Sequence, residues 1–240
     1  MRQPAFLTTH WSVVLAANRA NPTRAREALE RLCRTYWYPL YAYVRLRGHS
    51  PEDAKDLTQE FFARLLAAHS LAHADPNRGK FRSFLLGAMN HCLADEAAKG
   101  RAQKRGGGRA PIPLDLIDAE QRFEPEPTDA AAPDQAFDRH WATALLSEVL
   151  ARLETEYRRE GKAALFDALR QTLVGARESQ PYALLARQLG LNDGAVRTAA
   201  HRLRKRYREL IRDEVANTVS SPAEIDDEIR YLFRMSAANR

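Results

Sequence analysis

The chain has 240 residues, of which 45% are hydrophobic and 28% charged, so it should fold into one large domain or two of about 100 residues. No apolar run approaches the roughly 20 residues that cross a bilayer, and residues 1–11 lack the layout of a secretory signal. We therefore expect a cytoplasmic protein with no membrane association. Its two cysteines, Cys33 and Cys92, are too few for a zinc site of about four clustered ligands, so we expect buried thiols, no metal and no cofactor.

The net charge of +6 permits a polyanionic partner, and the distribution of charge is more informative. Residues 99–109 contain five Lys/Arg and no acid, and residues 197–212 contain seven Lys/Arg and one acid. Residues 115–138 contain eight Asp/Glu, and residues 213–228 contain six and no base. These blocks suggest two surfaces for nucleic acid, separated by an acidic connector and followed by an acidic tail.

Helical apolar spacing runs through nearly the whole chain, without strand alternation, so we expect an all-α fold. The first helix should begin at Asn21-Pro22, a cap followed by proline, and should kink at Pro39. Its expected buried face is Leu29, Leu32, Cys33, Tyr36, Leu40 and Val44.

Two further helices are expected in the first half. One starts at Ser50-Pro51, where Asp53 completes a capping-box-like pattern. Its expected core face is Ala54, Leu57, Phe61 and Leu65. The other begins near Lys80, and its expected stripe is Phe81, Phe84, Leu85, Ala88 and Cys92.

A linker should divide the chain, because three glycines at 106–108 end the first half and five prolines mixed with acids follow between Pro111 and Pro133. Helical periodicity resumes near Phe137. The expected parts are an N-terminal extension (1–24), a first helical domain (25–108), an acidic Pro-rich linker (109–136), a second helical domain (137–212) and an acidic tail (213–240). The tail should contain a short amphipathic helix with Ile225, Ile229, Leu232 and Phe233 on one face. Such a helix would dock on the basic domain or on a regulator.

Residues 182–206 have the pattern of a helix-turn-helix. Gly190 supplies the tight turn, and Asn192 or Asp193 caps the helix that follows. The expected inward residues are Leu184, Leu185 and Leu189 on the first helix and Val196, Ala200, Leu203 and Tyr207 on the second.

The outward face of the second helix is basic. A recognition helix reads bases near its N-terminal end and holds phosphates elsewhere. Arg197, Thr198 and His201 are therefore the expected base readers. The expected phosphate contacts are Arg202, Arg204, Lys205 and Arg206. The alternative is a solvated basic helix without a ligand.

Asp53, Asp56 and Glu60 share the polar face of the helix that starts at Ser50-Pro51. Clustered carboxylates are compatible with a metal or acid–base site, but no adjacent His, Cys or nucleophile supports catalysis. The other two interpretations are a solvated face and a docking surface for a basic partner helix.

Three segments resemble the sigma-70 family of bacterial transcription-initiation subunits, in particular its compact extracytoplasmic-function (ECF) group. GAVRTAAHRLRKRYREL resembles the region 4 helix-turn-helix, DLTQEFF resembles region 2.2, and TYWYPLYAYVRLRG resembles region 2.1. The resemblance covers roughly residues 25–105 and 140–212. It implies a helical region 2 bundle and a region 4 helix-turn-helix joined by the acidic linker.

The resemblance also implies partners and contact residues. Region 2.2 binds the clamp helices of the polymerase β′ subunit. The resemblance assigns this contact to Asp53, Asp56, Gln59 and Glu60. Region 4 reads the promoter −35 element and docks on the β flap. The resemblance assigns the −35 contacts to Asp193, Arg197, Thr198, His201, Arg202, Arg204 and Lys205. The third helix would face the −10 element. The resemblance assigns the −10 contacts to Arg78, Lys80, Arg82, Asn90, His91, Lys99 and Arg101.

The chain departs from the family pattern in two places. Ala199 stands where relatives often have an arginine, which removes one expected DNA contact. Asn90-His91 stands where relatives often have Arg-Asn, so the −10 specificity does not carry over.

The sequence thus predicts a non-enzymatic sigma factor that binds core RNA polymerase and promoter DNA. We expect an anti-sigma regulator to control it. The alternatives are a free-standing helix-turn-helix regulator of operator DNA and, in another class, a carboxylate-dependent nuclease. Phosphorylation of Thr58 would add negative charge to the helix that carries the acidic face, and is considered as a switch.

Overall fold

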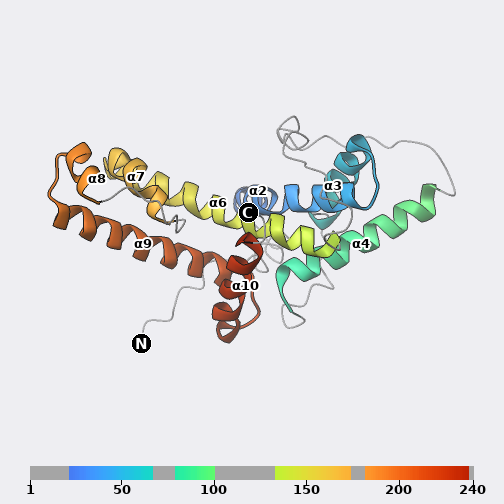
Figure 1. Cartoon of the computed structure of the whole chain (residues 1–240). Coiled ribbons are helices and arrows are strands. Elements are labelled where there is room, and N and C mark those ends of the chain that lie inside the picture. The colour runs from blue at the N-terminus through green and yellow to red at the C-terminus, as the bar shows by residue number, and fades with distance from the viewer. Residues whose placement is uncertain (1–21, 67–78, 101–132, 174–181, 238–240) are drawn as a thin grey trace. The chain divides into compact units, whose positions relative to one another are not determined.

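The computed structural model describes residues 22–66, 79–100, 133–173 and 182–237, and these residues contain helices and no strand (Figure 1). The all-α expectation is confirmed. The elements are α2 (Pro22–Leu46), α3 (Pro51–Leu66), α4 (Phe81–Gly100), α6 (Pro133–Arg159), α7 (Ala163–Leu169), η2 (Arg170–Leu173), α8 (Tyr182–Leu189), α9 (Asp193–Ala216), η3 (Pro222–Glu224) and α10 (Ile225–Ala237).

The described residues form two compact units, one of residues up to 144 together with those from 216 onward, and one of residues 145–215. The start of α6 and the whole of α10 therefore belong with the first unit. Most of the expected N-terminal extension, 1–24, and most of the expected linker, 109–136, lie outside the described residues. The expected domain limits stay a prediction.

Helix α2 is the centre of the first unit. From residue 35 to residue 44 only Tyr38 is not buried, so this part of α2 is enclosed on all sides rather than on one stripe. Tyr36 meets Phe81 of α4 edge to face, with 5.5 Å between the ring centroids. Tyr43 meets Phe137 of α6 in the same way at 6.4 Å. These contacts bring the starts of α4 and α6 onto α2.

The core faces of α3 and α4 differ from those expected. On α3, Leu57 is half-exposed, and Thr58 is fully buried with its hydroxyl donating to the Ala54 carbonyl at 2.7 Å. On α4, Phe84 and Ala88 are half-exposed, and Met89 is fully buried. Thr58 and Met89 thus take the places expected for their neighbours Leu57 and Ala88, because a 3.6-residue period marks an apolar side of a helix but not its centre line.

The second unit has its own core. Helix α6 contributes Leu145, Val149 and Leu153, while α7 contributes Phe166, and all four are buried. Tyr157 of α6 packs on Phe166, with 6.0 Å between the ring centroids. From α8 and α9 the buried residues are Leu185, Ala186, Val196, Ala200, Leu203, Leu210, Ile211, Glu214 and Val215. This core fixes how α8 and α9 meet.

The tail returns to the first unit. Ile225 and Leu232 of α10 are buried, whereas Phe233 is 45% exposed, so the expected apolar face was wrong at Phe233. None of the helices within the described part of the chain is long and apolar enough to cross a membrane.

Candidate functional sites

The acidic face of α3 starts at an N-cap formed by Ser50. The Ser50 hydroxyl accepts the Asp53 amide at 3.1 Å and donates to the Asp53 carboxylate at 2.7 Å. Asp53 and Asp56 are exposed. The cap therefore fixes the first turn of a helix whose acidic side chains face solvent.

The other two residues expected on this face are less accessible. Gln59 and Glu60 are half-buried. Glu60 pairs with Arg64 at 2.8 Å, and Arg64 also binds Glu96 of α4 at 2.6 Å. The hydrogen bond that Arg64 donates to Glu60 raises the pKa of the Arg64 guanidinium above its usual range. This pairing ties α3 to α4, and it is a structural role that the sequence did not show.

No group of three or more His, Cys, Asp or Glu side chains within the described ranges is arranged to hold a metal ion. The three carboxylates on the polar face of α3 are therefore not gathered into one site. Thr58 does not lie on that face either, because its side chain is fully buried. The interpretation of Thr58 as a surface phosphorylation switch was wrong.

A groove of about 510 Å³ lies between α3 and α4. Its lining includes Phe61, Leu65, Phe84 and Cys92, together with His91, one of the residues expected near the −10 element. Burial raises the pKa of the Cys92 thiol, so that thiol stays protonated at neutral pH.

The remaining residues expected to contact the −10 element are in varied surroundings. Asn90 is half-buried, and its Oδ1 accepts the Tyr43 hydroxyl at 2.7 Å and Arg47 at 3.4 Å. Lys80 and Arg82, at the start of α4, are engaged by the C-terminal helix, as described below. Arg78, Arg101 and the side chain of Lys99 lie outside the described residues.

Helices α8 and α9 form the helix-turn-helix unit. Gly190 has a φ of 65°, and the amides of Gly190 and Leu191 donate to the carbonyls of Arg187 and Ala186 in a Schellman motif. Asn192 caps α9 by accepting the Ala195 amide at 2.8 Å. The expectation that Leu184 faces inward was wrong, because its side chain is 47% exposed.

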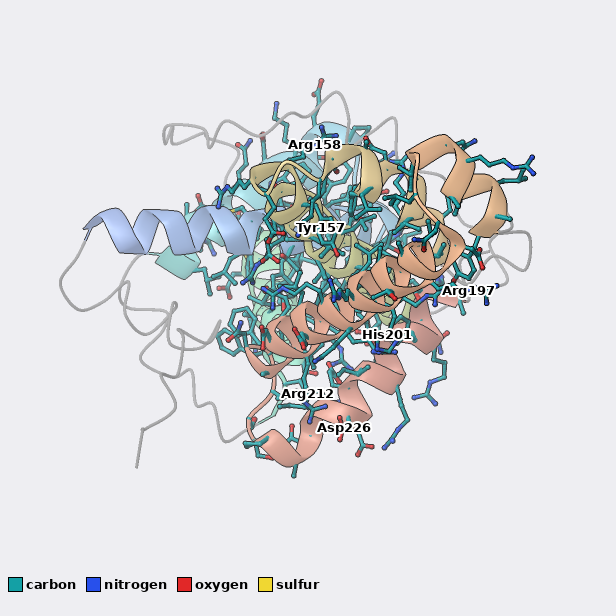
Figure 2. All side chains as sticks on the ribbon, turned by 90° about the vertical axis from the view of Figure 1, so that its left-hand side faces the viewer. Tyr157, Arg158, Arg197, His201, Arg212 and Asp226 are labelled. Atoms are coloured by element: carbon teal, nitrogen blue, oxygen red, sulfur yellow. The ribbon has the colours of Figure 1, made fainter. Side chains whose placement is uncertain are left out.

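Helix α9 presents an exposed polar face at its N-terminal half, where Figure 2 labels Arg197 and His201. Arg197 pairs with Asp193 at 2.8 Å and lies 5.5 Å from the centroid of the Tyr182 ring. The exposed residues on this face are Arg197, Thr198, His201, Arg202 and Lys205.

Two basic residues of α9 have internal partners instead. Arg204 donates to the Tyr182 hydroxyl at 2.6 Å and to the Thr172 carbonyl at 3.3 Å. Arg206 binds both carboxylate oxygens of Glu156 at 2.8 and 2.9 Å. Both are half-buried, so they brace the second unit. Their partners lie 22 to 50 residues away in sequence, and no local pattern pointed to them.

The first unit contains a segment that matches a known protein family. A family model described as Sigma-70 region 2 matches residues 32–103, which include α3, α4 and the second half of α2. No curated protein and no solved structure matches the chain. Residues 32–103 of the chain therefore form a sigma-70 region 2 domain.

Proposed function

We propose that this protein is a compact, ECF-type sigma factor that binds core RNA polymerase and directs transcription initiation at specific promoters. The region 2 match carries the general assignment, because region 2 is the polymerase-binding and promoter-opening part of sigma-70 proteins. As a polymerase subunit it acts in the cytoplasm and has no catalytic step of its own.

The exposed side of α3 is the proposed polymerase contact. Asp53 and Asp56 project into solvent from a capped, regular helix inside the matched region. Exposed carboxylates of this kind complement a basic partner helix through charge-assisted hydrogen bonds. We assign this surface, together with Gln59 and Glu60, to the clamp helices of β′.

The exposed face of α9 is the proposed −35 reader. Helix α9 follows a tight, glycine-dependent turn after α8, as a recognition helix does. Arg197, Thr198 and His201 lie near its N-terminal end, where base edges are read, and the exposed Arg202 and Lys205 follow for phosphates. Docking of this unit on the β flap, and control by an anti-sigma regulator, belong to the same proposal.

The polymerase contact is tested with the double variant Asp56→Ala, Glu60→Ala in the full chain. We expect binding to core polymerase to be lost, measured by co-elution or fluorescence anisotropy, while circular dichroism stays unchanged. Glu52→Ala is the matched control, because Glu52 is an exposed acid in the first turn of the same helix and outside the proposed contact. Core affinity of the double variant equal to that of Glu52→Ala would reject the assignment.

A free-standing operator-binding regulator is the second candidate. It accounts for α8 and α9 but leaves the region 2 match unexplained. Such regulators usually bind as dimers to two half-sites. A monomer that requires core polymerase for promoter-specific binding would exclude it.

A further inference from the structure

The C-terminal helix carries a carboxylate that is bound by two cations of the first unit. Glu228 of α10 is fully buried, and its Oε2 lies 2.5 Å from the Lys80 ammonium nitrogen. Its other oxygen pairs with the Arg82 guanidinium. Charged carboxylates are almost never fully buried unless they are paired in this way.

Arg82 is held on several sides, and only 7% of the residue is exposed. It binds Asp138 of α6 at 2.8 Å, and Asp138 also accepts the Tyr231 hydroxyl at 2.5 Å. The guanidinium lies 4.5 Å from the Tyr231 ring centroid and 4.9 Å from that of Trp141. Helix α10 therefore supplies both an anion and an aromatic face to Arg82.

The segment before α10 also engages the start of α4. The Phe81 amide donates to the Thr218 carbonyl at 3.0 Å, and the Ser220 hydroxyl donates to the Gly79 carbonyl at 2.9 Å. In Figure 1, α10 lies beside the first turn of α4, in agreement with these contacts. The basic start of α4 is thus covered by one continuous part of the tail.

Lys and Arg side chains at the start of a helix bind phosphate by the same chemistry that holds Glu228 here. We propose that Lys80 and Arg82 form an anion site that Glu228 fills in the free protein, and that a phosphate of nucleic acid takes its place when α10 moves away. Helix α10 is then an internal competitor for DNA. This inference rests on the proposed function for the identity of its ligand.

The exchange is energetically feasible. A buried ion pair contributes little net stability, because the cost of desolvating both charges offsets most of their attraction. Replacing one anion by another keeps both cations paired. The remaining hold on α10 comes from the contacts of Tyr231 with Asp138 and Arg82 and from Ile225 and Leu232, its two buried aliphatic side chains.

The test compares Glu228→Gln with the wild-type chain in binding a fluorescent single-stranded oligonucleotide of mixed sequence. If the open state is a minor population of about 0.1–10%, freeing the site tightens binding by about tenfold or more. Asp227→Asn is the matched control, because it removes the same charge from an exposed position of α10, where Asp227 pairs only with neighbouring Arg230 among the described contacts. Equal affinities for Glu228→Gln and wild type, or an equal gain in Asp227→Asn, would overturn the proposal.

A second measurement uses the unmodified protein, in case Glu228→Gln is unfolded. Hydrogen exchange of residues 225–237 should accelerate when the protein enters a complex with core polymerase and promoter DNA. Unchanged or slower exchange there would overturn the anion site. The proposed function is tested by a separate measurement of transcription initiation. Initiation that depends on the wild-type protein supports the proposed function even if the anion-site proposal is wrong. Absent initiation rejects the proposed function even if Glu228→Gln binds DNA more tightly.

Discussion

Basic side chains on α9 divide into two groups that the sequence does not separate. Arg197, Arg202 and Lys205 are exposed, whereas Arg204 and Arg206 are half-buried against partners within the second unit. Charge and spacing alone predicted one continuous basic face. Long-range partners such as Glu156 decide which arginines are free for DNA, and a local pattern contains no information about them.

At Arg197 we predict a loss of base discrimination without a loss of stability. Arg197→Ala removes an exposed side chain whose pair with Asp193 contributes little to folding. If Arg197 makes a bidentate base contact, discrimination at one −35 position falls by about 1–3 kcal/mol. Binding to a set of single-base promoter variants measures this.

Lys205→Ala is the control for Arg197→Ala. Lys205 is exposed further along α9 and is assigned to phosphate. Its removal should weaken all sequences alike and lower the salt slope of binding by about one. A uniform loss in Arg197→Ala as well would contradict its role as a base reader.

At the scale of elements, the starts of helices followed from local chemistry. Pro22 begins α2, Pro51 begins α3 after the Ser50 cap, and Gly190 separates α8 from α9, as the sequence predicted. These signals act within about four residues, so they are readable without the fold. The return of α10 to the start of α4 spans more than 140 residues, and the sequence offered only an amphipathic helix with two possible docking sites.

Helices α6 and α9 are joined by the pair of Glu156 and Arg206, which makes a pH-dependent contribution to stability. Hydrogen bonds from Arg206 lower the pKa of Glu156 below the ordinary value of about 4.3. The stabilisation is therefore complete above that value and is lost as the pH falls through the lower pKa of the folded state. We expect Glu156→Gln to destabilise the protein at pH 7 and to cost clearly less at pH 3, measured by urea unfolding.

Glu154→Gln is the control for this effect. Glu154 lies on the same helix but pairs with Arg158 in an exposed i,i+4 arrangement. Such exposed pairs contribute little to stability, so this variant should lose less than Glu156→Gln at pH 7. A penalty for Glu156→Gln that is the same at both pH values would contradict the assigned role of the pair.

For the molecule as a whole, the sequence predicted an all-helical chain with a polymerase-binding half. The described residues confirm the helical class, and the family model confirms a sigma-70 region 2 domain at residues 32–103. The sequence did not predict which segments make up the first compact unit. It includes the start of α6 and the tail, because buried contacts such as Tyr43 with Phe137 join segments that composition assigns to different parts.

A sigma factor makes core RNA polymerase start transcription at defined promoters, and we expect such initiation only when this protein is added. The direct measurement is transcription of a promoter library by purified core polymerase with and without the full chain, read by sequencing the 5′ ends of the transcripts. We expect a set of start sites that requires the protein and is lost with the double variant Asp56→Ala, Glu60→Ala. Identical start sites with and without the protein would contradict it.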